Sequence, residues 1–486
     1  MNNSIADLMP SAVWGYFDQI CKIPRPSKKE DQIRQFIVYE ARALGLEYII
    51  TEIGNVVINK PAFSGMENCK KITIQVHMDM VPAKLQSSSH NFETDPIKAY
   101  IDGQWVTADG TTLGADNGIG IAFALAILKS KDIKHGPLEI LATTDEEAGM
   151  TGAFGLNHGE ISGDILLNLD SENDTEVCIG CAGGINTEIK LPIKKVNYDK
   201  VGKIALKVAL DGLYSGHSGV DIHLGRANAI KEIANLMYSL QQIVSFDLCH
   251  ISGGKLRNVI PAYCEIIIIV ENKDKDALIK FIKSFEADLK HEYVKTESRL
   301  KLTVSDIQLP DTIIETQTVH NLILALKSCF NGMLEMNWEL NIPQTSSNLG
   351  VIKSVNNEIE IISLQRSPDA FAKKNLAKQV AAPFELIGAK TFYSGEYPGW
   401  LPNLSSEMLG VVTKGYKEIF SQEVKVSATH GGLECGLILD KYSKMDAVSI
   451  GPTICDPHSA NERVSIKSVD KIWTLLQNIL SNTPRK

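Results

Sequence analysis

Short apolar segments that end in an acid or a histidine, or are followed directly by one, recur along this chain. They constrain its fold more than any other feature. Five segments share this pattern: VHMD at 76–79, GADNG at 114–118, TTDEE at 143–147, LNLD at 167–170 and PTICDPHS at 452–459. Helical patterns such as GIGIAFALAILKS lie between them, and strands alternating with helices predict a mainly parallel or mixed α/β sheet. Ligands of open α/β sheets bind beyond the carboxyl ends of the strands, so these segments predict a functional site there.

Composition excludes several classes of function. The chain has 486 residues, 44% of them hydrophobic, which indicates two or three domains. A net charge of -9 without a basic tract argues against nucleic-acid binding as a main role. The first residues lack the pattern of a signal peptide, and no apolar run reaches the roughly 18–20 residues of a membrane span. We therefore expect a soluble cytoplasmic protein, in which nine scattered cysteines do not form a disulfide framework.

The character of the sequence changes twice, which predicts an inserted domain. After Gly183–Gly184 the pattern becomes that of an α+β unit, and near residue 400 the first pattern returns. We predict a first domain made of 1–184 and 400–486, interrupted by a domain of 185–399 with two similar halves, about 185–300 and 301–399. This organisation predicts a cleft between the domains, a common location for ligand sites.

One local signal predicts the start of a helix near residue 30. Ser27 is followed three residues later by Glu30, and the sequence then continues as DQIRQFIVYEARALG. This spacing resembles a capping box, in which both side chains bond to backbone N–H groups of the first turn. We therefore expect Ser27 to cap this helix.

The residue types at the five segments favour a metal site. Imidazole and carboxylate ligands suit zinc, with Mn, Co or Fe as alternatives. Two histidines with three or four acids exceed the needs of one catalytic zinc and match two metals that share a bridging carboxylate. His77 and Asp79 lie on one face of a strand, so the aspartate can orient the histidine. Taken alone, each motif is also compatible with a solvated charge or a hydrogen-bonded core histidine.

Six longer motifs resemble one known family. They occur in the order VHMDMV, LGADNGIGIA, TTDEEAGMTGA, LNLDSE, YSGHSGVDIHLGRANAI and GPTICDPHSANERV. These motifs resemble the di-zinc metallopeptidase family M20, which includes carboxypeptidase G, aminoacylase and the dipeptidases, and within it the aminoacyl-histidine dipeptidase group. The resemblance runs from IPRPSKKE to ANERVSI. It implies an α/β fold with a di-zinc aminopeptidase-like catalytic domain, whose mixed central sheet is flanked by helices, and an inserted α+β lid domain that is either single or duplicated.

The resemblance implies a role for each matching residue. In the catalytic domain it implies one zinc on His77 and Asp170, another on Glu147 and His458, a bridging Asp116, the general base Glu146 and Asp79 as the partner of His77. In the lid it implies an oxyanion donor at His217, substrate contacts at Asn258 and Arg366, and a substrate-side lining by the glycines around Gly431. His430 beside them is either near the site or an ordinary histidine.

These roles predict a cytosolic metallo-dipeptidase with two Zn²⁺ per chain, for which Co²⁺ or Mn²⁺ can substitute. The expected substrates are dipeptides, including Xaa-His and β-Ala-His types, with no nucleic-acid or membrane partner. Two enzymatic alternatives are an N-acyl amino acid deacylase and a tripeptidase. A non-catalytic metal or peptide carrier is a third, although it should have lost Glu146. The sequence leaves both a monomer and a homodimer open.

Overall fold

The computed structural model describes residues 4–486 and divides into two compact units. Unit 1 comprises the chain up to Gly180, Trp400–Ala428 and Leu433–Lys486, and unit 2 comprises Cys181–Gly399 with Thr429–Gly432. The first boundary lies four residues before the expected one. The sequence placed Thr429–Gly432 in the first domain, whereas the structure packs it with unit 2, because the N–H of Ala182 donates to the carbonyl of Thr429 and His430 pairs with Ser346.

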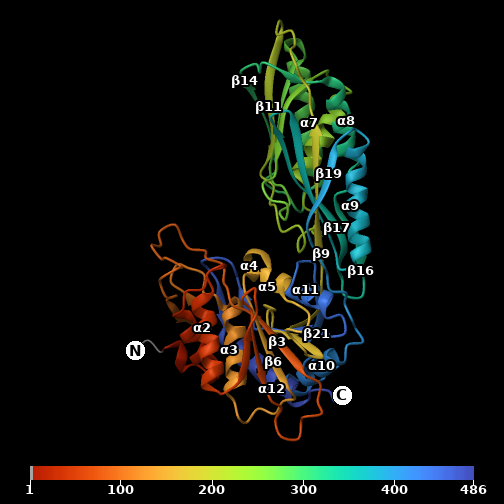
Figure 1. Ribbon diagram of the computed structural model, residues 1–486. Helices are drawn as coiled ribbons and strands as arrows, with labels where there is room; N and C mark the ends of the chain where they lie inside the picture. Colours follow the sequence, from red (N-terminus) through yellow and green to blue (C-terminus); the bar gives the residue numbers. More distant parts are fainter. Residues whose placement is uncertain (1–3) are drawn as a thin grey trace. The chain divides into compact units, whose positions relative to one another are not determined.

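Unit 1 is built on an eight-stranded mixed sheet (Figure 1). Its order is β1 (Glu47–Ile50), β2 (Val56–Lys60), β6 (Leu138–Thr143), β3 (Ile72–His77), β7 (Ile165–Asn168), β21 (Asp446–Ser449), β8 (Glu176–Cys181) and β20 (Lys425–Thr429). The central strands β6, β3, β7 and β21 are parallel and fully or largely buried, as their apolar sequences predict. A small sheet accompanies it, with the order β22 (Ile454–Cys455), β23 (Arg463–Ser465), β5 (Trp105–Ala108) and β4 (Ala99–Asp102).

The helices of unit 1 pack on this sheet and on one another. They are α1 (Ser11–Cys21), α2 (Asp31–Ala43), α3 (Ala115–Lys129), α4 (Glu146–Gly149), α5 (Thr151–Gly155), α10 (Glu407–Phe420), α11 (Glu434–Lys441) and α12 (Ile466–Ser481), after a 3₁₀ turn at Ile5–Asp7. The helix α3 is apolar on all sides and buried from Ala115 to Leu128, because it contacts α1, α2 and β3.

The predicted capping box at Ser27 is wrong. Helix α2 begins at Asp31, and its N-cap residue Glu30 makes no side-chain cap bond. The hydroxyl of Ser27 instead donates to Asp79 at 2.8 Å, and Glu30 accepts from the N–H groups of Lys28 and Asp145. Both side chains therefore form hydrogen bonds with loop residues near the predicted site instead of capping the helix. Local sequence spacing could not reveal these long-range partners.

Unit 2 is built on a nine-stranded antiparallel sheet. Its order is β14 (Lys301–Ile307), β11 (Lys203–Asp211), β13 (Cys264–Glu271), β12 (Asp247–Gly253), β17 (Ile342–Val355), β18 (Glu358–Ser367), β9 (Gly183–Pro192) and β19 (Lys390–Tyr397), with β16 (Gly332–Asn337) beside β17. The helices are α6 (Ala229–Leu240), α7 (Lys275–Glu292), α8 (Thr316–Ser328) and α9 (Ala370–Glu385), with a 3₁₀ turn at Asn272–Asp274. The short strands β10 (Lys195–Val196) and β15 (Ile313–Ile314) pair separately.

The sheet of unit 2 contains two halves with the same topology. One half follows the order β11, α6, β12, β13, α7, β14, and the other follows β9, α8, β17, β18, α9, β19. Their strands appear in mirrored order across the sheet and join where Ser252 and Gly253 pair with Lys353 and Ile352. The expected division at 300/301 is wrong for two strands, because β9 belongs with the later half and β14 with the first. The first half is inserted after β9, so consecutive segments of sequence do not correspond to the halves.

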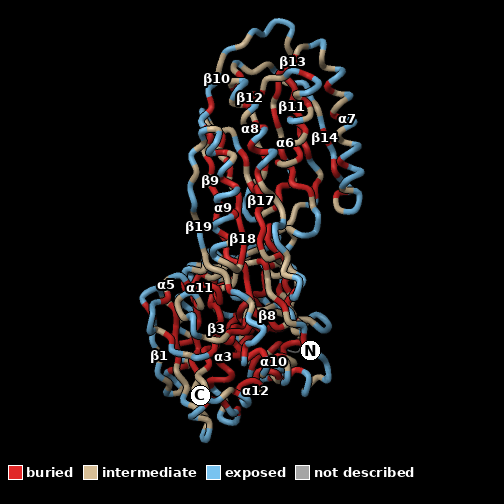
Figure 2. The backbone as a smooth tube through the Cα atoms, turned by 90° about the vertical axis from the view of Figure 1, so that its right-hand side faces the viewer, coloured by how far each residue is buried: buried red, intermediate tan, exposed pale blue. Residues whose placement is uncertain are grey.

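Buried residues, most of them apolar, run along the strands and helices of each unit (Figure 2). A single apolar cluster of unit 2 includes residues of both halves, such as Leu206 and Ile361. The fold class expected from the sequence, an α/β domain with a mixed sheet and an inserted α+β domain, is confirmed. Among residues 4–486 no helix is long and apolar enough to cross a membrane.

Candidate functional site

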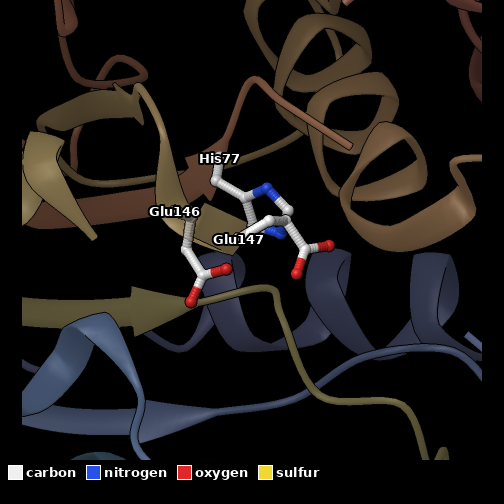
Figure 3. Close-up of side chains that lie close together, drawn as sticks. All are labelled: His77, Glu146 and Glu147. Carbon is white, nitrogen blue, oxygen red and sulfur yellow. The ribbon is translucent and has the colours of Figure 1, made fainter. Parts of the chain in front are cut away.

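The parallel strands of unit 1 bring the predicted ligands to one edge of the sheet. His77 is the last residue of β3 and pairs in register with Thr143, the last residue of β6. Gln75 pairs with Asn168, the last residue of β7, so Asp170 follows two residues beyond the same edge. The left-handed backbone of Asp145 (φ 53°) turns the chain from β6 into α4, which begins with Glu146 and Glu147. The two acids point in different directions from this turn (Figure 3).

Asp116 lies between the two histidines. Its Oδ1 is 3.0 Å from Nε2 of His77, and its Oδ2 is 3.2 Å from Nε2 of His458. Asp170 completes a first cluster at 3.1 Å from His77, and Glu147 completes a second at 3.0 Å from His458. The structure therefore brings together the five predicted ligands as two groups of three that share Asp116, each with atoms close enough to hold one metal ion.

The donor set fits metal ions. Three carboxylates, Asp116, Glu147 and Asp170, crowd into a largely buried space, and one oxygen of Glu147 has no hydrogen-bond partner among residues 4–486. Buried carboxylates are costly unless cations or donors compensate them. Mixed imidazole and carboxylate donors are those that zinc and related divalent ions prefer.

Asp79 holds the turn that carries the two glutamates. It accepts the N–H of Glu146 at 2.9 Å and that of Glu147 at 3.1 Å, and its Oδ1 lies 3.4 Å from Nδ1 of His77. Burial alone would raise the pKa of Asp79, but His77 and these donors lower it to about 2. Asp79 is thus an ionised partner of both the histidine and the turn, as expected for a residue that orients a ligand.

Glu146 differs from its neighbour in its proton affinity. Burial raises the pKa of Glu146 well above its ordinary value, and the nearby Asp170, Glu434 and Glu147 add to this shift while His77 opposes it. A carboxylate with a raised pKa can accept a proton near neutral pH.

Sequence reasoning missed a buried polar chain beneath this edge. Glu434, at the start of α11, is fully buried and accepts from Gln75 at 2.6 Å and Thr143 at 2.5 Å. Burial raises the pKa of Glu434 to about 8. The only sequence signal was a polar Gln75 within the apolar strand ITIQVH, two residues before His77.

Unit 2 contains a second polar cluster, here called the donor cluster, made of His217, Arg366, Tyr397, Ser346 and His430. Nη2 of Arg366 lies 3.4 Å from Nε2 of His217, Nη1 donates to the hydroxyl of Tyr397 at 2.9 Å, and Nε has no hydrogen-bond partner within the described part of the chain. Arg366 is 4% exposed, and no ion pair involves it among residues 4–486. The cluster thus contains a buried cation without an anion.

The tautomer of His217 follows from its neighbours. Its Nδ1 accepts the N–H groups of Gly219 and Val220 at 3.3 and 3.2 Å, so the ring proton is assigned to Nε2. Burial and the charge of Arg366 lower the pKa of His217 to about 4. A neutral ring at pH 7 therefore has its N–H beside the guanidinium of Arg366.

Two further residues, Asn258 and Gly431, were predicted to contact the substrate, and the structure shows their surroundings. Asn258 is exposed, and its carbonyl accepts the N–H of Ser218 at 2.9 Å in a loop beside His217. Gly431 lies next to His430, which pairs with Ser346 at 2.7 Å. It is Gly432 that makes room for Tyr397, because a Cβ there would lie 3.0 Å from the ring. Sequence reasoning missed Ser346 and Tyr397, which stand in no recognisable motif.

Comparisons with known proteins agree with this architecture. Residues 208–297 match a family model described as the M20 peptidase dimerisation domain. The chain is 39% identical over 485 residues, covering all of both chains, to the cytosol non-specific dipeptidase of Escherichia coli. It is 41% identical to the crystal structure of the aminoacylhistidine dipeptidase of Vibrio alginolyticus, with a TM-score of 0.92 over 100% of this chain and 99% of that one.

A more distant structure shares only the fold. The aminopeptidase PepT of Bacillus cereus is 15% identical, with a TM-score of 0.58 over 98% of each chain. The full-length identities of 39% and 41% show more than a shared fold, because they establish family membership. The chain belongs to the M20 peptidase family, together with these dipeptidases.

Proposed function

We propose that the chain is a metallo-dipeptidase that hydrolyses the peptide bond of dipeptides, including Xaa-His and β-Ala-His types. The observation that carries the proposal is the pair of ligand groups that share Asp116, with Glu146 beside them. His77, Asp116 and Asp170 would hold one ion, and Asp116, Glu147 and His458 the other. Two zinc ions per chain fit this donor set, with Co²⁺ or Mn²⁺ as substitutes.

When bound, two such ions supply acidification of a water molecule and polarisation of the scissile carbonyl. Glu146 takes the proton of the attacking water and passes it to the leaving amine, as its raised pKa allows. Asp79 keeps the amides of Glu146 and Glu147 in place, so that one acid serves as a ligand and the other as a base.

The donor cluster supplies the complementary groups. Nε2–H of His217 donates to the oxyanion that develops on the scissile carbonyl. Arg366, a buried cation that forms no ion pair with any described residue, holds the free carboxylate of the dipeptide, for which its planar fork is suited. Asn258 and the segment around Gly431 contribute further polar contacts to the substrate.

The E. coli relative is named a cytosolic enzyme, and we place this chain in the same compartment. A homodimer stays a prediction, supported by the dimerisation-domain match at 208–297, and sedimentation velocity tests it.

The testing experiment is hydrolysis by metal-stripped protein after addition of Zn²⁺, Mn²⁺ or Co²⁺. The substrates are β-Ala-His, Gly-His, Leu-Gly, an N-acetyl amino acid and a tripeptide. Metal-dependent cleavage confined to the dipeptides is expected. Cleavage of the acetyl compound or the tripeptide instead would assign the chain to the deacylases or tripeptidases. Metal binding without any cleavage would indicate a binding protein.

A further inference from the structure

Glu462, in the motif ANERV, is a buried carboxylate to which the roles above assign nothing. It is 2% exposed and directly precedes β23. Its two oxygens accept four consecutive backbone N–H groups, those of Leu113 (2.9 Å), Gly114 (2.9 Å), Ala115 (2.7 Å) and Asp116 (3.3 Å). These amides form the turn that opens α3 and carries Asp116, so one side chain determines the path of this turn.

Arg25 holds the same turn from another direction. Its guanidinium is buried and donates to the carbonyls of Met78 (3.0 Å), Asp79 (2.7 Å) and Gly114. A Cβ at Gly114 would lie 2.7 Å from Nη2 of Arg25, and Gly114 has a φ of +70°, so the turn requires glycine here. The turn that carries Asp116 is therefore held on two sides. Arg25 links the carbonyl of Gly114 to the residues that follow β3, and Glu462 binds the amides of the turn.

Glu462 also belongs to the loop of His458. The loop is bonded internally, because the N–H of Glu462 donates to the carbonyl of Ser459 at 3.2 Å and the hydroxyl of Ser459 donates to the carbonyl of Asp456 at 2.8 Å. The hydroxyl of Thr107 on β5 donates to the carbonyl of Glu462 at 2.8 Å. Glu462 thus connects the segment that carries His458 to the turn that carries Asp116.

We propose that Glu462 is a positioning residue that keeps Asp116 and His458 at a fixed separation. It therefore controls one of the two metal ions more than the other. The second ligand group, Asp116, Glu147 and His458, depends on it for two of its three members, whereas the first depends on it only for Asp116. The inference rests on the proposed metal centre.

The geometry requires a carboxylate. Four N–H donors match two acceptor oxygens, whereas a glutamine would direct its NH₂ group at two of these amides. Those amides are buried, so leaving them unpaired is costly and the turn is expected to shift. Residues that orient metal ligands typically change metal affinity by about 10- to 100-fold when altered.

The test is a zinc titration of metal-free protein by competition with a chromophoric chelator, for wild type, Glu462→Gln and Glu462→Asp. The matched control is Glu139→Gln. Glu139 is also 2% exposed and accepts from Lys71, Thr73 and Ser162, but it lies near the amino end of β6, away from the ligands. We expect Glu462→Gln to weaken one zinc-binding step at least about tenfold and the other much less. His458→Ala should weaken the same step, and Glu139→Gln neither.

Several outcomes would overturn the inference. Two zinc-binding steps within twofold of wild type in Glu462→Gln would show that Glu462 does not position the ligands, and equal weakening of both steps would contradict its link to His458. If Glu462→Gln does not fold, the milder Glu462→Asp decides, with hydrogen exchange of the Ala115 and Asp116 amides as the second measurement; unchanged exchange and affinity would reject the role. Wild-type protein that binds no zinc would instead refute the metal centre itself.

Discussion

The two polar clusters have opposite charge requirements. The cluster at the sheet edge of unit 1 gathers Asp79, Asp116, Glu146, Glu147 and Asp170 around two histidines. The donor cluster of unit 2 gathers a buried guanidinium, the hydroxyl of Tyr397 and the N–H of a neutral His217, without an acid in contact with Arg366. Carboxylates outnumber the histidines in the first cluster, whereas no acid pairs with the guanidinium of the second among residues 4–486.

This difference favours a different class of ligand for each cluster. Unpaired buried charge is costly, so a fold retains it where a ligand supplies the compensation. Under the proposed function, metal ions would compensate the acids, and the carboxylate and developing oxyanion of a peptide would compensate the donors. In a dipeptide the free carboxylate lies close to the scissile bond. A group that binds this carboxylate, as proposed for Arg366, would therefore favour dipeptides over longer peptides.

The largest expected effect comes from changing Glu146, the acid of the sheet-edge cluster to which we assign the role of general base. Glu146→Gln should reduce kcat by about 10²- to 10⁴-fold, because the amide cannot take the proton of the attacking water. Zinc content should stay at the wild-type value, since the ligand atoms are intact. Steady-state kinetics together with metal analysis measure both quantities. Near-normal turnover in this variant would remove Glu146 from the mechanism.

His217→Ala tests the oxyanion role proposed for the donor cluster. Loss of a single oxyanion donor typically lowers kcat by about 10²- to 10³-fold. KM should change little, because the oxyanion forms only after the substrate has bound. His320→Ala is the matched control, since His320 is an exposed histidine on α8. A variant of His217 in which only KM rises would indicate a substrate contact rather than an oxyanion donor.

Arg366→Lys tests whether the donor cluster binds the carboxylate of the substrate. Lysine keeps the charge but loses the planar fork that bonds Tyr397 and faces His217, so KM for dipeptides should rise by about 10- to 100-fold. The corresponding dipeptide amides lack the carboxylate and should be poor substrates for both proteins, with little difference between them. An equal loss on dipeptides and their amides would place Arg366 outside carboxylate binding.

The sheet-edge cluster was predictable from the sequence to a greater extent than the donor cluster. Among its predicted ligands, His77 ends the apolar strand ITIQVH and Asp170 lies two residues after ILLN, and parallel strands bring their carboxyl ends to one edge. The donor cluster joins residues from loops and antiparallel strands far apart in the chain, for example Ser346 and His430. No local periodicity relates such positions, so only the family resemblance indicated His217 and Arg366.

Topology was also only partly predictable. The alternation of elements gave the fold class, but β9 and the rest of its half are separated by the whole inserted first half, so the division at 300/301 could not be correct. The role of Ser27 was misassigned because a capping box and a bond to a distant Asp79 require the same residue type. Local patterns report elements, whereas long-range polar pairs depend on the assembled fold.

The smallest expected effect concerns His430, whose role the sequence left open. His430 is 4% exposed and bonded to Ser346, and burial lowers the pKa of its ring to about 3, with Arg366 and His217 adding to the shift. An unfolded histidine titrates near 6.5, so between about pH 6.5 and 3 the unfolded chain binds a proton that the folded chain excludes. The stability that neutral His430 contributes is therefore complete above about pH 6.5 and is lost as the pH falls toward 3.

His430→Gln keeps a polar group for Ser346 without titrating, so unit 2 of this variant should lose at least about 1 kcal/mol less stability over that range. Hydrogen exchange of the β17 and β18 amides at several pH values measures this directly, with His320→Gln as the exposed control. Equal pH dependence in wild type and His430→Gln would mean that the His430 ring is charged in the folded protein, and the donor cluster would then contain a second cation beside Arg366.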